Sequence, residues 1–144
     1  MLISICIPTY NSGDKLDRLL DSVKIQTFTD YEIIISDDSR NNGVKESIEN
    51  KYSDLDIKYY HNKEALGTPD NWNNAVSLAA GQWIKLMHHD DWFFDENSLQ
   101  KFVDGTKKDP KAKLIFCAFR NAYLDKGTTE DFFCSPLEIF LLRR

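Results

Sequence analysis

The sequence predicts a doubly wound α/β fold, in which helices cover both faces of a mostly parallel sheet. Short and nearly continuous apolar runs alternate along the chain with segments whose apolar residues recur at helical spacing. Strands of a parallel sheet are buried on both faces, so they consist of unbroken apolar runs rather than alternating ones. The 144 residues contain no internal repeat and no Gly/Ser-rich linker, which favours a single domain over residues 1–144.

The first two strand–helix units are expected within residues 3–52. Apolar strands are predicted at 3–7 (ISICI), closed by Pro8, and at 32–36 (EIIIS), and each is followed by a polar, turn-rich stretch. After each strand, apolar residues three and four positions apart mark the buried face of a helix. These residues are Leu16, Leu19, Leu20, Val23, Val44, Ile48 and Tyr52.

Three further strands are predicted, at 57–60 (IKYY), 83–87 (WIKLM) and 114–119 (LIFCAF). Before the second of these, Thr68 is expected to cap a helix that has Pro69 at its first position, and Gly81 is expected to end it. The inner face of that helix is predicted to hold Trp72, Ala75, Val76 and Ala79. Another helix, marked by Leu99, Phe102 and Val103, precedes Pro110.

Composition excludes several classes of protein. The net charge of −5 provides no basic field for a nucleic-acid backbone. Three widely spaced cysteines fit neither a disulfide framework nor a zinc knuckle, and Cys6 and Cys117 lie in apolar runs, where a thiol is expected to be buried. The apolar run 1–7 is too short for a signal peptide or a membrane span. We therefore expect a cytoplasmic protein with no transmembrane segment and no nucleic-acid partner.

Polar residues at the ends of three strands are the candidate site, because ligands of open parallel sheets bind beyond the carboxyl ends of the strands. Two acidic pairs stand at such ends, Asp37-Asp38 and Asp90-Asp91. Neighbouring carboxylates repel each other, and a cation relieves that repulsion. Aspartate and phosphate oxygens are usual ligands of Mg²⁺ and Mn²⁺. The remaining strand-end candidates are Pro8, Thr9, Tyr10, Asn11, Ser39, His88 and His89.

Structural alternatives to a ligand site remain open at this stage. Asp37-Asp38 fits a turn cap, HHDD fits a solvated loop or a helix cap, and Tyr10 and Trp72 fit partly buried and core aromatics. Other nucleotide folds fit less well, because PTYNSGDK after the first strand is neither a dinucleotide-binding loop nor a Walker loop. A phosphoacceptor receiver domain would carry acids there, and a sugar nucleotidyltransferase would carry a Gly-rich, Arg-bearing loop. Without a phosphate-binding loop, a bound metal would have to neutralise the charge of a diphosphate.

Three segments carry a specific combination of motifs: CIPTYN, LLDSVKIQTFTDYEIIISDDS and NWNNAVSLAAGQWIKLMHHDDW. Their order and spacing over residues 3–119 resemble the nucleotide-binding half of family 2 glycosyltransferases, which have the GT-A fold. The resemblance implies binding of a nucleoside-diphosphate sugar, a UDP-sugar before others, and its inverting transfer to an acceptor hydroxyl. It further implies a glycan or lipid-linked acceptor in polysaccharide or cell-surface glycan synthesis, and allows a peripheral location at the inner face of the membrane.

The resemblance also assigns site residues. The residues that it implies for the nucleotide sugar are Pro8, Thr9, Tyr10, Asn11, Asp38 and Asp90. Asp90 and Asp91 are implied as ligands of Mn²⁺ or Mg²⁺ on the diphosphate. Two departures from the family pattern stand out: His88 replaces the first acid of D-x-D-D, and Trp72 stands where many relatives have an arginine.

The catalytic base of inverting relatives lies well beyond the acidic motif, and the chain ends too soon after Asp91 to reach it. Glu130 and Asp131 come too early and are not assigned this role. We therefore expect a truncated domain whose acceptor-binding half is largely absent, with an inactive nucleotide-binding module as the alternative. A homodimer is expected through an apolar tail that comprises Phe132, Phe133, Ile139, Phe140, Leu141 and Leu142.

Overall fold

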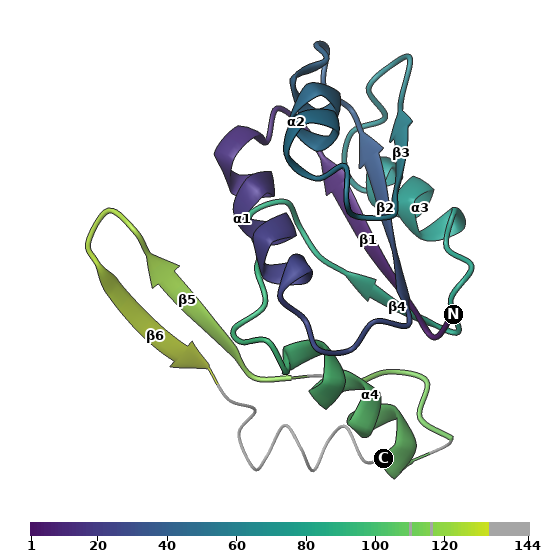
Figure 1. The fold of residues 1–144 in the computed structure, drawn as a ribbon, viewed down its shortest axis with the longest axis vertical. Coiled ribbons are helices and arrows are strands. Elements are labelled where there is room, and N and C mark those ends of the chain that lie inside the picture. The colour runs from purple at the N-terminus through teal and green to yellow at the C-terminus, as the bar shows by residue number, and fades with distance from the viewer. Residues whose placement is uncertain (110, 116, 133–144) are drawn as a thin grey trace. The chain divides into compact units, whose positions relative to one another are not determined.

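A computed structural model describes residues 1–109, 111–115 and 117–132, and the chain forms two compact units, Met1–Lys101 and Phe102–Arg144. The expectation of a single domain stays a prediction. The first unit contains the main sheet and its helices (Figure 1). Its elements are β1 (Ile3–Thr9), α1 (Gly13–Lys24), β2 (Tyr31–Asp37), α2 (Gly43–Lys51), β3 (Ile57–His61), α3 (Asp70–Ser77), β4 (Trp83–Leu86) and the start of α4 (Ser98–Lys108).

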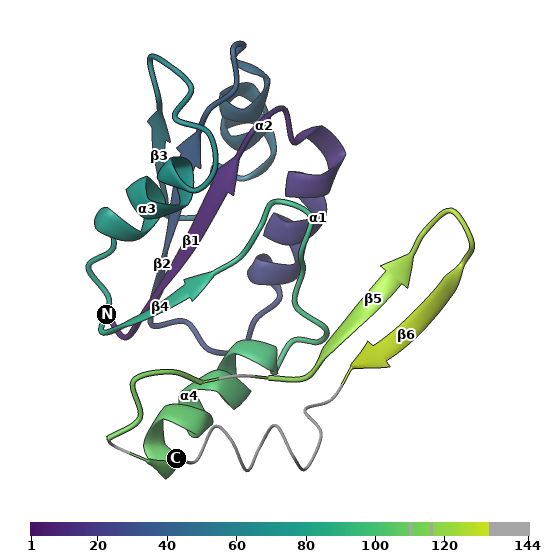
Figure 2. The ribbon, with the colours of Figure 1, turned by 180° about the vertical axis from the view of Figure 1, so that it is seen from behind.

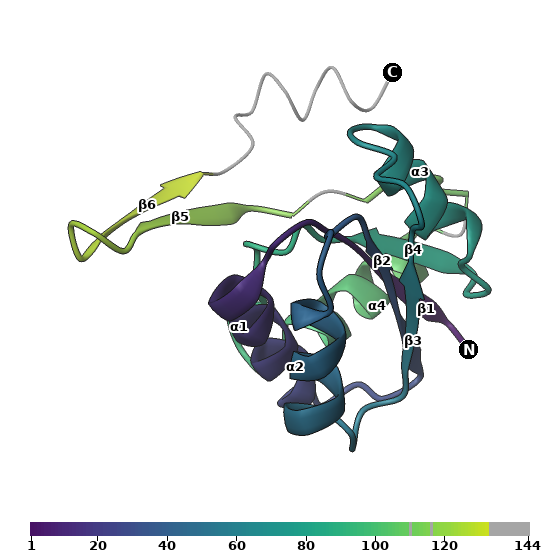
Figure 3. The ribbon, with the colours of Figure 1, turned by 90° about the horizontal axis from the view of Figure 1, so that it is seen from above.

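The main sheet has four parallel strands in the order β3-β2-β1-β4. Helices α1 and α2 cover one face and α3 covers the other, as Figure 2 and, from above, Figure 3 show. This arrangement confirms the doubly wound α/β class. Because β1 lies between β2 and β4, the loops that follow these three strands emerge side by side at one edge of the sheet.

The core forms on both faces of the sheet, as the apolar runs predict. The four apolar residues expected on α1 are all buried, and Cys6 and Ile34 pack on the opposite face against Ala75 of α3. Burial, with a smaller effect of Glu32, raises the pKa of the Cys6 thiol to about 12, so this thiol behaves as an inert apolar group. The expectation for Cys117 is wrong, because its side chain is exposed.

Pro8 does not close the first strand, because β1 continues one residue beyond it. The carbonyl of Cys6 accepts a hydrogen bond from the N–H of Met87, the residue that follows β4. Backbone groups two residues apart point to the same side of a strand, so Pro8 faces the β4 side after β4 has ended. The missing N–H of proline therefore interrupts no ladder bond, and the strand can continue.

Two details of the α3 segment also differ from expectation. The helix begins at Asp70 with Pro69, not Thr68, at the N-cap position. Gly81 lies beyond the helix end at Ser77, and a Cβ atom there would lie 2.7 Å from the backbone nitrogen of Ser4. Glycine is required at position 81 because the turn before β4 passes against the backbone of β1.

The predicted fifth parallel strand at 114–119 is wrong. The structure has instead an antiparallel hairpin of β5 (Phe119–Tyr123) and β6 (Thr128–Phe132), which forms a separate sheet in the second unit. Leu114, inside the apolar run, is 67% exposed. Of the described residues in this run, Phe119 alone belongs to a strand, so the apolar run does not form the strand that its composition predicts.

Among the described residues, no helix combines the length and the apolar character that crossing a membrane requires. Most of the expected apolar tail, namely Phe133, Ile139, Phe140, Leu141 and Leu142, lies outside the described residues. The homodimer therefore stays a prediction.

Candidate functional site

Asp37 joins the carboxyl ends of β1, β2 and β3. It is fully buried, and its Oδ1 accepts hydrogen bonds from the Thr9 hydroxyl (3.0 Å) and the Ser39 backbone N–H (2.9 Å). Its Oδ2 accepts the Tyr59 hydroxyl at 2.7 Å, and burial together with this carboxylate raises the pKa of Tyr59. Asp37 thus caps the turn after β2, which was one of the open alternatives, and the Thr9 side chain is bound to it.

Asp38 holds the loop that follows β3. Its side chain is 4% exposed, and its Oδ1 accepts hydrogen bonds from the Asn62 side-chain amide (2.8 Å) and the Leu66 N–H (3.1 Å). Its Oδ2 accepts the N–H of Gly67 at 2.8 Å, where a φ of +73° requires glycine. The carboxylate therefore shapes the loop 62–67 beside the predicted site.

A buried polar network connects α3 to these strand ends, and the sequence reasoning missed it. The Ser36 hydroxyl donates to Asn71 Oδ1 (2.6 Å) and accepts from Asn74 Nδ2 (2.8 Å). Asn62 Nδ2 also donates to Asn71 Oδ1, and Asn71 Nδ2 donates to the carbonyl of Thr9 (3.2 Å). The sequence does contain a signal for this network. Asn71 and Asn74 are three residues apart on a predicted helix, and this spacing places both on one face.

The loop after β1 presents an exposed aromatic side chain. Tyr10 is 51% exposed, whereas Pro8 is buried within the strand. The next residue, Asn11, has a φ of +48°, and its N–H donates to the Ser39 hydroxyl at 2.8 Å, which links this loop to the loop after β2. Tyr10 thus leaves about half of its surface free at the carboxyl edge of the sheet.

A pocket of about 420 Å³ opens at the carboxyl ends of β2 and β3. This volume falls within the usual range of small-molecule sites. Its floor is fixed, since His61 Nε2 donates to the carbonyl of Ser39 at 2.8 Å. The lining combines both signs of charge with polar groups: Asp38, Ser39, Arg40, His61, Asn62, Lys63, Glu64 and Ala65.

The acidic motif after β4 forms a tight turn. The Asp91 N–H donates to the His88 carbonyl (3.0 Å), and the Asp91 carboxylate accepts the His88 N–H (3.1 Å). Asp90 is exposed on this turn. Within the part of the chain that the structure describes, no group of three or more His, Cys, Asp or Glu side chains is arranged to hold a metal. A cation at this turn would need oxygen ligands from a bound nucleotide.

The two departures from the family pattern lie in contact with each other. The rings of Trp72 and His88 have centroids 4.5 Å apart at an interplanar angle of 39°. Trp72 is half-buried on α3, so it is neither a pure core residue nor a free surface residue. The Nε2 atom of His88 is buried and has no hydrogen-bond partner among the described residues.

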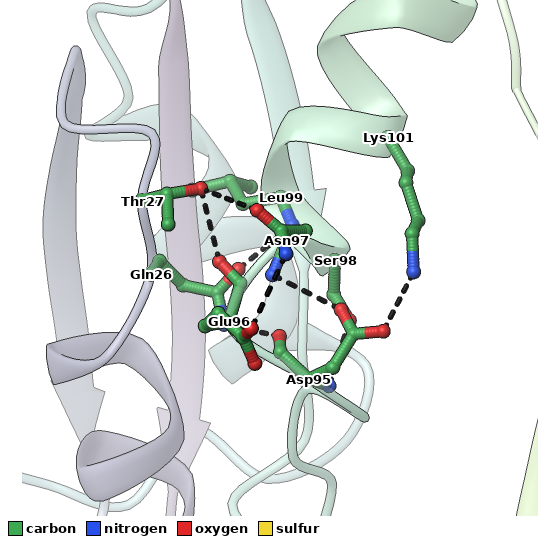
Figure 4. Close-up of polar contacts among 8 residues, drawn as sticks. All are labelled: Gln26, Thr27, Asp95, Glu96, Asn97, Ser98, Leu99 and Lys101. Atoms are coloured by element: carbon green, nitrogen blue, oxygen red, sulfur yellow. Dashed lines mark hydrogen bonds and ion pairs between the residues drawn. The ribbon is translucent and has the colours of Figure 1, made fainter.

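The Gln26-Thr27 pair of the recognised QTF segment anchors the chain after the acidic turn (Figure 4). Gln26 is buried, and its amide donates to the carbonyl of Asp95 (2.8 Å) and accepts the N–H of Leu99 (2.8 Å). The N–H of Thr27 donates to the carbonyl of Glu96 at 2.9 Å. The segment between β4 and α4 is thereby fixed at its α4 end.

Known proteins provide an independent comparison. The model of the family "Glycosyl transferase family 2" matches residues 4–130. Abequosyltransferase RfbV of Salmonella typhimurium is 41% identical over 111 residues, which cover 72% of this chain and 33% of that protein. The Escherichia coli UDP-Glc:α-D-GlcNAc-diphosphoundecaprenol β-1,3-glucosyltransferase WfaP is 32% identical over 140 residues, covering 96% of this chain and 53% of that protein.

A solved structure shows the same fold. Staphylococcus aureus TarS in complex with UDP-GlcNAc superposes with a TM-score of 0.65 at 26% identity, over 75% of this chain and 32% of that one. The GT-A class predicted from the motifs is thereby confirmed. The chain spans about a third to a half of the length of these relatives. Because the family match covers most of its residues, the chain belongs to glycosyl transferase family 2.

Proposed function

We propose that this chain is the donor-binding part of a glycosyltransferase and binds a nucleoside-diphosphate sugar, a UDP-sugar, for transfer to an acceptor hydroxyl. One observation carries the proposal: the pocket at β2 and β3, the exposed Tyr10 and the acidic turn after β4 share one edge of the sheet. Since β1 lies between β2 and β4, a ligand that spans this edge meets a nucleoside pocket first and an acidic turn last. A nucleotide sugar has the same order of parts.

The residues divide into those that contact the nucleoside and those that shape its site. Tyr10 is proposed to contact the base, since it is the exposed aromatic at this edge. Pro8, Thr9 and Asn11 position Tyr10 through β1 and the loop that follows it, and Asp38 acts by holding the loop 62–67 at the pocket. WfaP is a UDP-Glc-dependent glucosyltransferase by name, and TarS forms a complex with UDP-GlcNAc, which supports a uridine nucleotide.

Asp90 and Asp91 are proposed to hold a divalent cation, Mn²⁺ or Mg²⁺. The residues fit such an ion, because the turn presents the carboxylates of Asp90 and Asp91, which are both exposed, and a bound diphosphate would supply further oxygen ligands. A bound cation would neutralise the diphosphate in a chain that has no phosphate-binding glycine loop. Asp90 is the stronger candidate, because the Asp91 carboxylate also accepts the His88 N–H within the turn.

Inverting transfer also needs a base, which we place outside this chain. Of the two acids excluded earlier, Asp131 accepts two hydrogen bonds from the Arg120 guanidinium, and Glu130 accepts the Tyr123 hydroxyl at 3.3 Å. Both therefore have structural partners in the β5–β6 hairpin. The acceptor in the name of WfaP is a sugar linked to diphosphoundecaprenol, which supports a lipid-linked acceptor in cell-surface glycan synthesis and a location at the inner face of the membrane.

Calorimetric titration with UDP, GDP and ADP, in Mn²⁺ and in EDTA, tests the proposal. UDP is expected to bind preferentially and roughly tenfold or more tightly with Mn²⁺, because contacts to charged groups contribute about 1.5–3 kcal/mol. Equal UDP affinity in Mn²⁺ and EDTA would contradict the cation site. The alternative, an inactive module, predicts the same binding but no transfer in any longer form of the protein. Absence of binding by all three nucleotides would exclude a donor site.

A further inference from the structure

Two consecutive residues that follow the acidic turn are held against helix α1. The connection from β4 to α4 passes along this helix, as Figures 1 and 2 show. Phe93 is buried, and its N–H donates to the hydroxyl of Ser22 at 3.0 Å. Trp92 is 37% exposed, and Cζ of Arg18 lies 5.0 Å from the centroid of its ring. Arg18 and Ser22 are four residues apart and share one face of α1, so one helix fixes both contacts.

The hydrogen-bonding edge of the Arg18 guanidinium is open to a ligand. A guanidinium that stacks on an aromatic ring uses its face, and its N–H groups point outward in its own plane. Two acids of the same helix, Asp17 and Asp21, are bound by residues at the end of α2. In the described part of the chain no carboxylate, that of Asp14 included, forms an ion pair with Arg18, whose side chain is exposed.

Exposed aromatic side chains lie on both sides of the buried Phe93. Phe94 is 68% exposed, and Trp92 exposes part of its indole beside the cation. The backbone here is anchored, because Phe93 is bound to α1 and the carbonyl of Asp95 accepts the side-chain amide of Gln26. The fold therefore holds apolar surface in the open next to a positive charge. This combination suits a ligand that joins a phosphate to an apolar chain.

We propose that Arg18 and Trp92 bind the diphosphate end of an isoprenoid-diphosphate acceptor. Arg18 donates hydrogen bonds to the phosphate oxygens, for which its planar fork is suited, and Trp92 holds the guanidinium and contacts the apolar chain. The proposal rests on the function proposed above, which places the donor diphosphate at the turn of Asp90 and Asp91. The acceptor in the name of WfaP carries its diphosphate on the sugar that receives the transfer. That diphosphate is therefore one sugar ring away from the reacting hydroxyl, and Trp92 directly follows the turn.

Calorimetric titration of the 144-residue chain with farnesyl diphosphate, a soluble isoprenoid diphosphate, tests the proposal. The titration is done in EDTA and without nucleotide, so that a cation at the acidic turn cannot bind the diphosphate. Farnesyl diphosphate is expected to bind at least about tenfold more tightly than inorganic diphosphate or farnesol, because each of these lacks one half of the ligand. This comparison separates a lipid diphosphate from a free one.

Variants assign the binding to the two side chains. Arg18→Ala should weaken farnesyl diphosphate binding by about tenfold or more, and Arg18→Lys should recover only part of this loss because lysine lacks the planar fork. Trp92→Ala should weaken the binding of farnesyl diphosphate more than that of inorganic diphosphate, because the indole contacts the apolar chain. Lys45→Ala is the matched control, since it removes an exposed positive charge from α2 and should keep the natural affinity. Thermal melts verify that each variant is folded.

Three results would overturn the lipid-diphosphate site: no binding of farnesyl diphosphate, equal binding of inorganic diphosphate, or an unchanged affinity in Arg18→Ala. An equal loss in Lys45→Ala would also overturn it, because it would show an unspecific attraction between charges. The titration with UDP and Mn²⁺ reports on the donor site separately. If UDP fails to bind while farnesyl diphosphate binds and depends on Arg18, the donor site is wrong and the lipid-diphosphate site is supported.

Discussion

Tyr10 is the exposed side chain on which the proposed contact with the base depends. It is 51% exposed and follows a strand end that is otherwise buried. Stacking of a base on an aromatic ring contributes roughly 1–3 kcal/mol, so Tyr10→Ala should weaken UDP binding by about 5- to 150-fold. Tyr10→Phe keeps the ring and should remain close to the natural chain. Because the contact is with the base, the loss should be equal in Mn²⁺ and in EDTA.

The control for this prediction is Tyr123→Ala, which removes another partly exposed tyrosine from the β5–β6 hairpin in the second unit. Calorimetry should show unchanged UDP affinity for this variant. If Tyr10→Ala binds UDP as tightly as the natural chain, or if Tyr10→Phe is as weak as Tyr10→Ala, the proposed base contact is wrong.

The roles of neighbouring residues were the hardest part to predict from the sequence. Asp37 and Asp38 look equivalent in the SDDS motif, yet one caps the turn after β2 and the other holds the loop after β3. Their partners come from elements far along the chain, which local pattern does not specify. The Trp72–His88 contact has the same origin: the fold brings together two positions that the sequence shows only as separate departures.

At the scale of elements, prediction succeeded where burial dominates. The first four strands and the helices between them follow from unbroken apolar runs and helical spacing, because a sheet covered on both faces requires them. It failed where the outcome depends on neighbours. Strand β1 passes through Pro8 because β4 has already ended there. Phe119, at the end of the last apolar run, pairs with Phe132 in a local hairpin and not with the main sheet.

Glu32 connects several elements at the amino end of the sheet. It is buried on β2, and its carboxylate accepts hydrogen bonds from the hydroxyl of Ser4 on β1, from Lys58 on β3 (2.6 Å) and from the N–H of Ala80 (2.8 Å) before β4. Burial alone would raise its pKa, but the hydrogen bonds from Lys58, Ser4 and Ala80 lower it to about 2. The charged form of this carboxylate therefore stabilises the folded state.

The lowered pKa predicts how stability depends on pH. The unfolded chain has the ordinary carboxyl pKa of 4.5, so the contribution is complete above that value and is lost as the pH falls toward about 2. It amounts to about 3 kcal/mol. Urea unfolding between pH 7 and pH 2 should show this loss in the natural chain and a flatter profile in Glu32→Gln. Glu49→Gln, an exposed control on α2, should keep the profile of the natural chain, and identical profiles for all three would contradict the role of Glu32.

At the scale of the whole molecule, the order of the strands brings residues of the candidate site together from distant parts of the sequence. Tyr10, Asp38 and Asp90 follow β1, β2 and β4, and the parallel order β3-β2-β1-β4 places all three at one edge. The same topology makes the proposed donor site a product of adjacent strands, in a chain that spans about a third to a half of these relatives' length. Adjacent strands and the loops that follow them are enough to form a site at the sheet edge. An acceptor site needs elements in addition to these strands.

The final prediction concerns transfer by this chain. A base must lie roughly 2.6–3.2 Å from the acceptor hydroxyl. At the sheet edge, Asp37 and Asp38 are hydrogen-bonded to other groups, and Asp90 and Asp91 are the residues that we propose for the cation. We therefore expect the 144-residue chain to bind UDP, hydrolyse a UDP-sugar slowly at most, and transfer no sugar to a diphosphoundecaprenol-linked acceptor in a radiolabel assay. WfaP, tested in parallel, is the positive control for donor and acceptor quality. Transfer by this chain at a rate comparable to WfaP would show that its own residues include a base. That base would then be one of the carboxylates to which we assign a structural role.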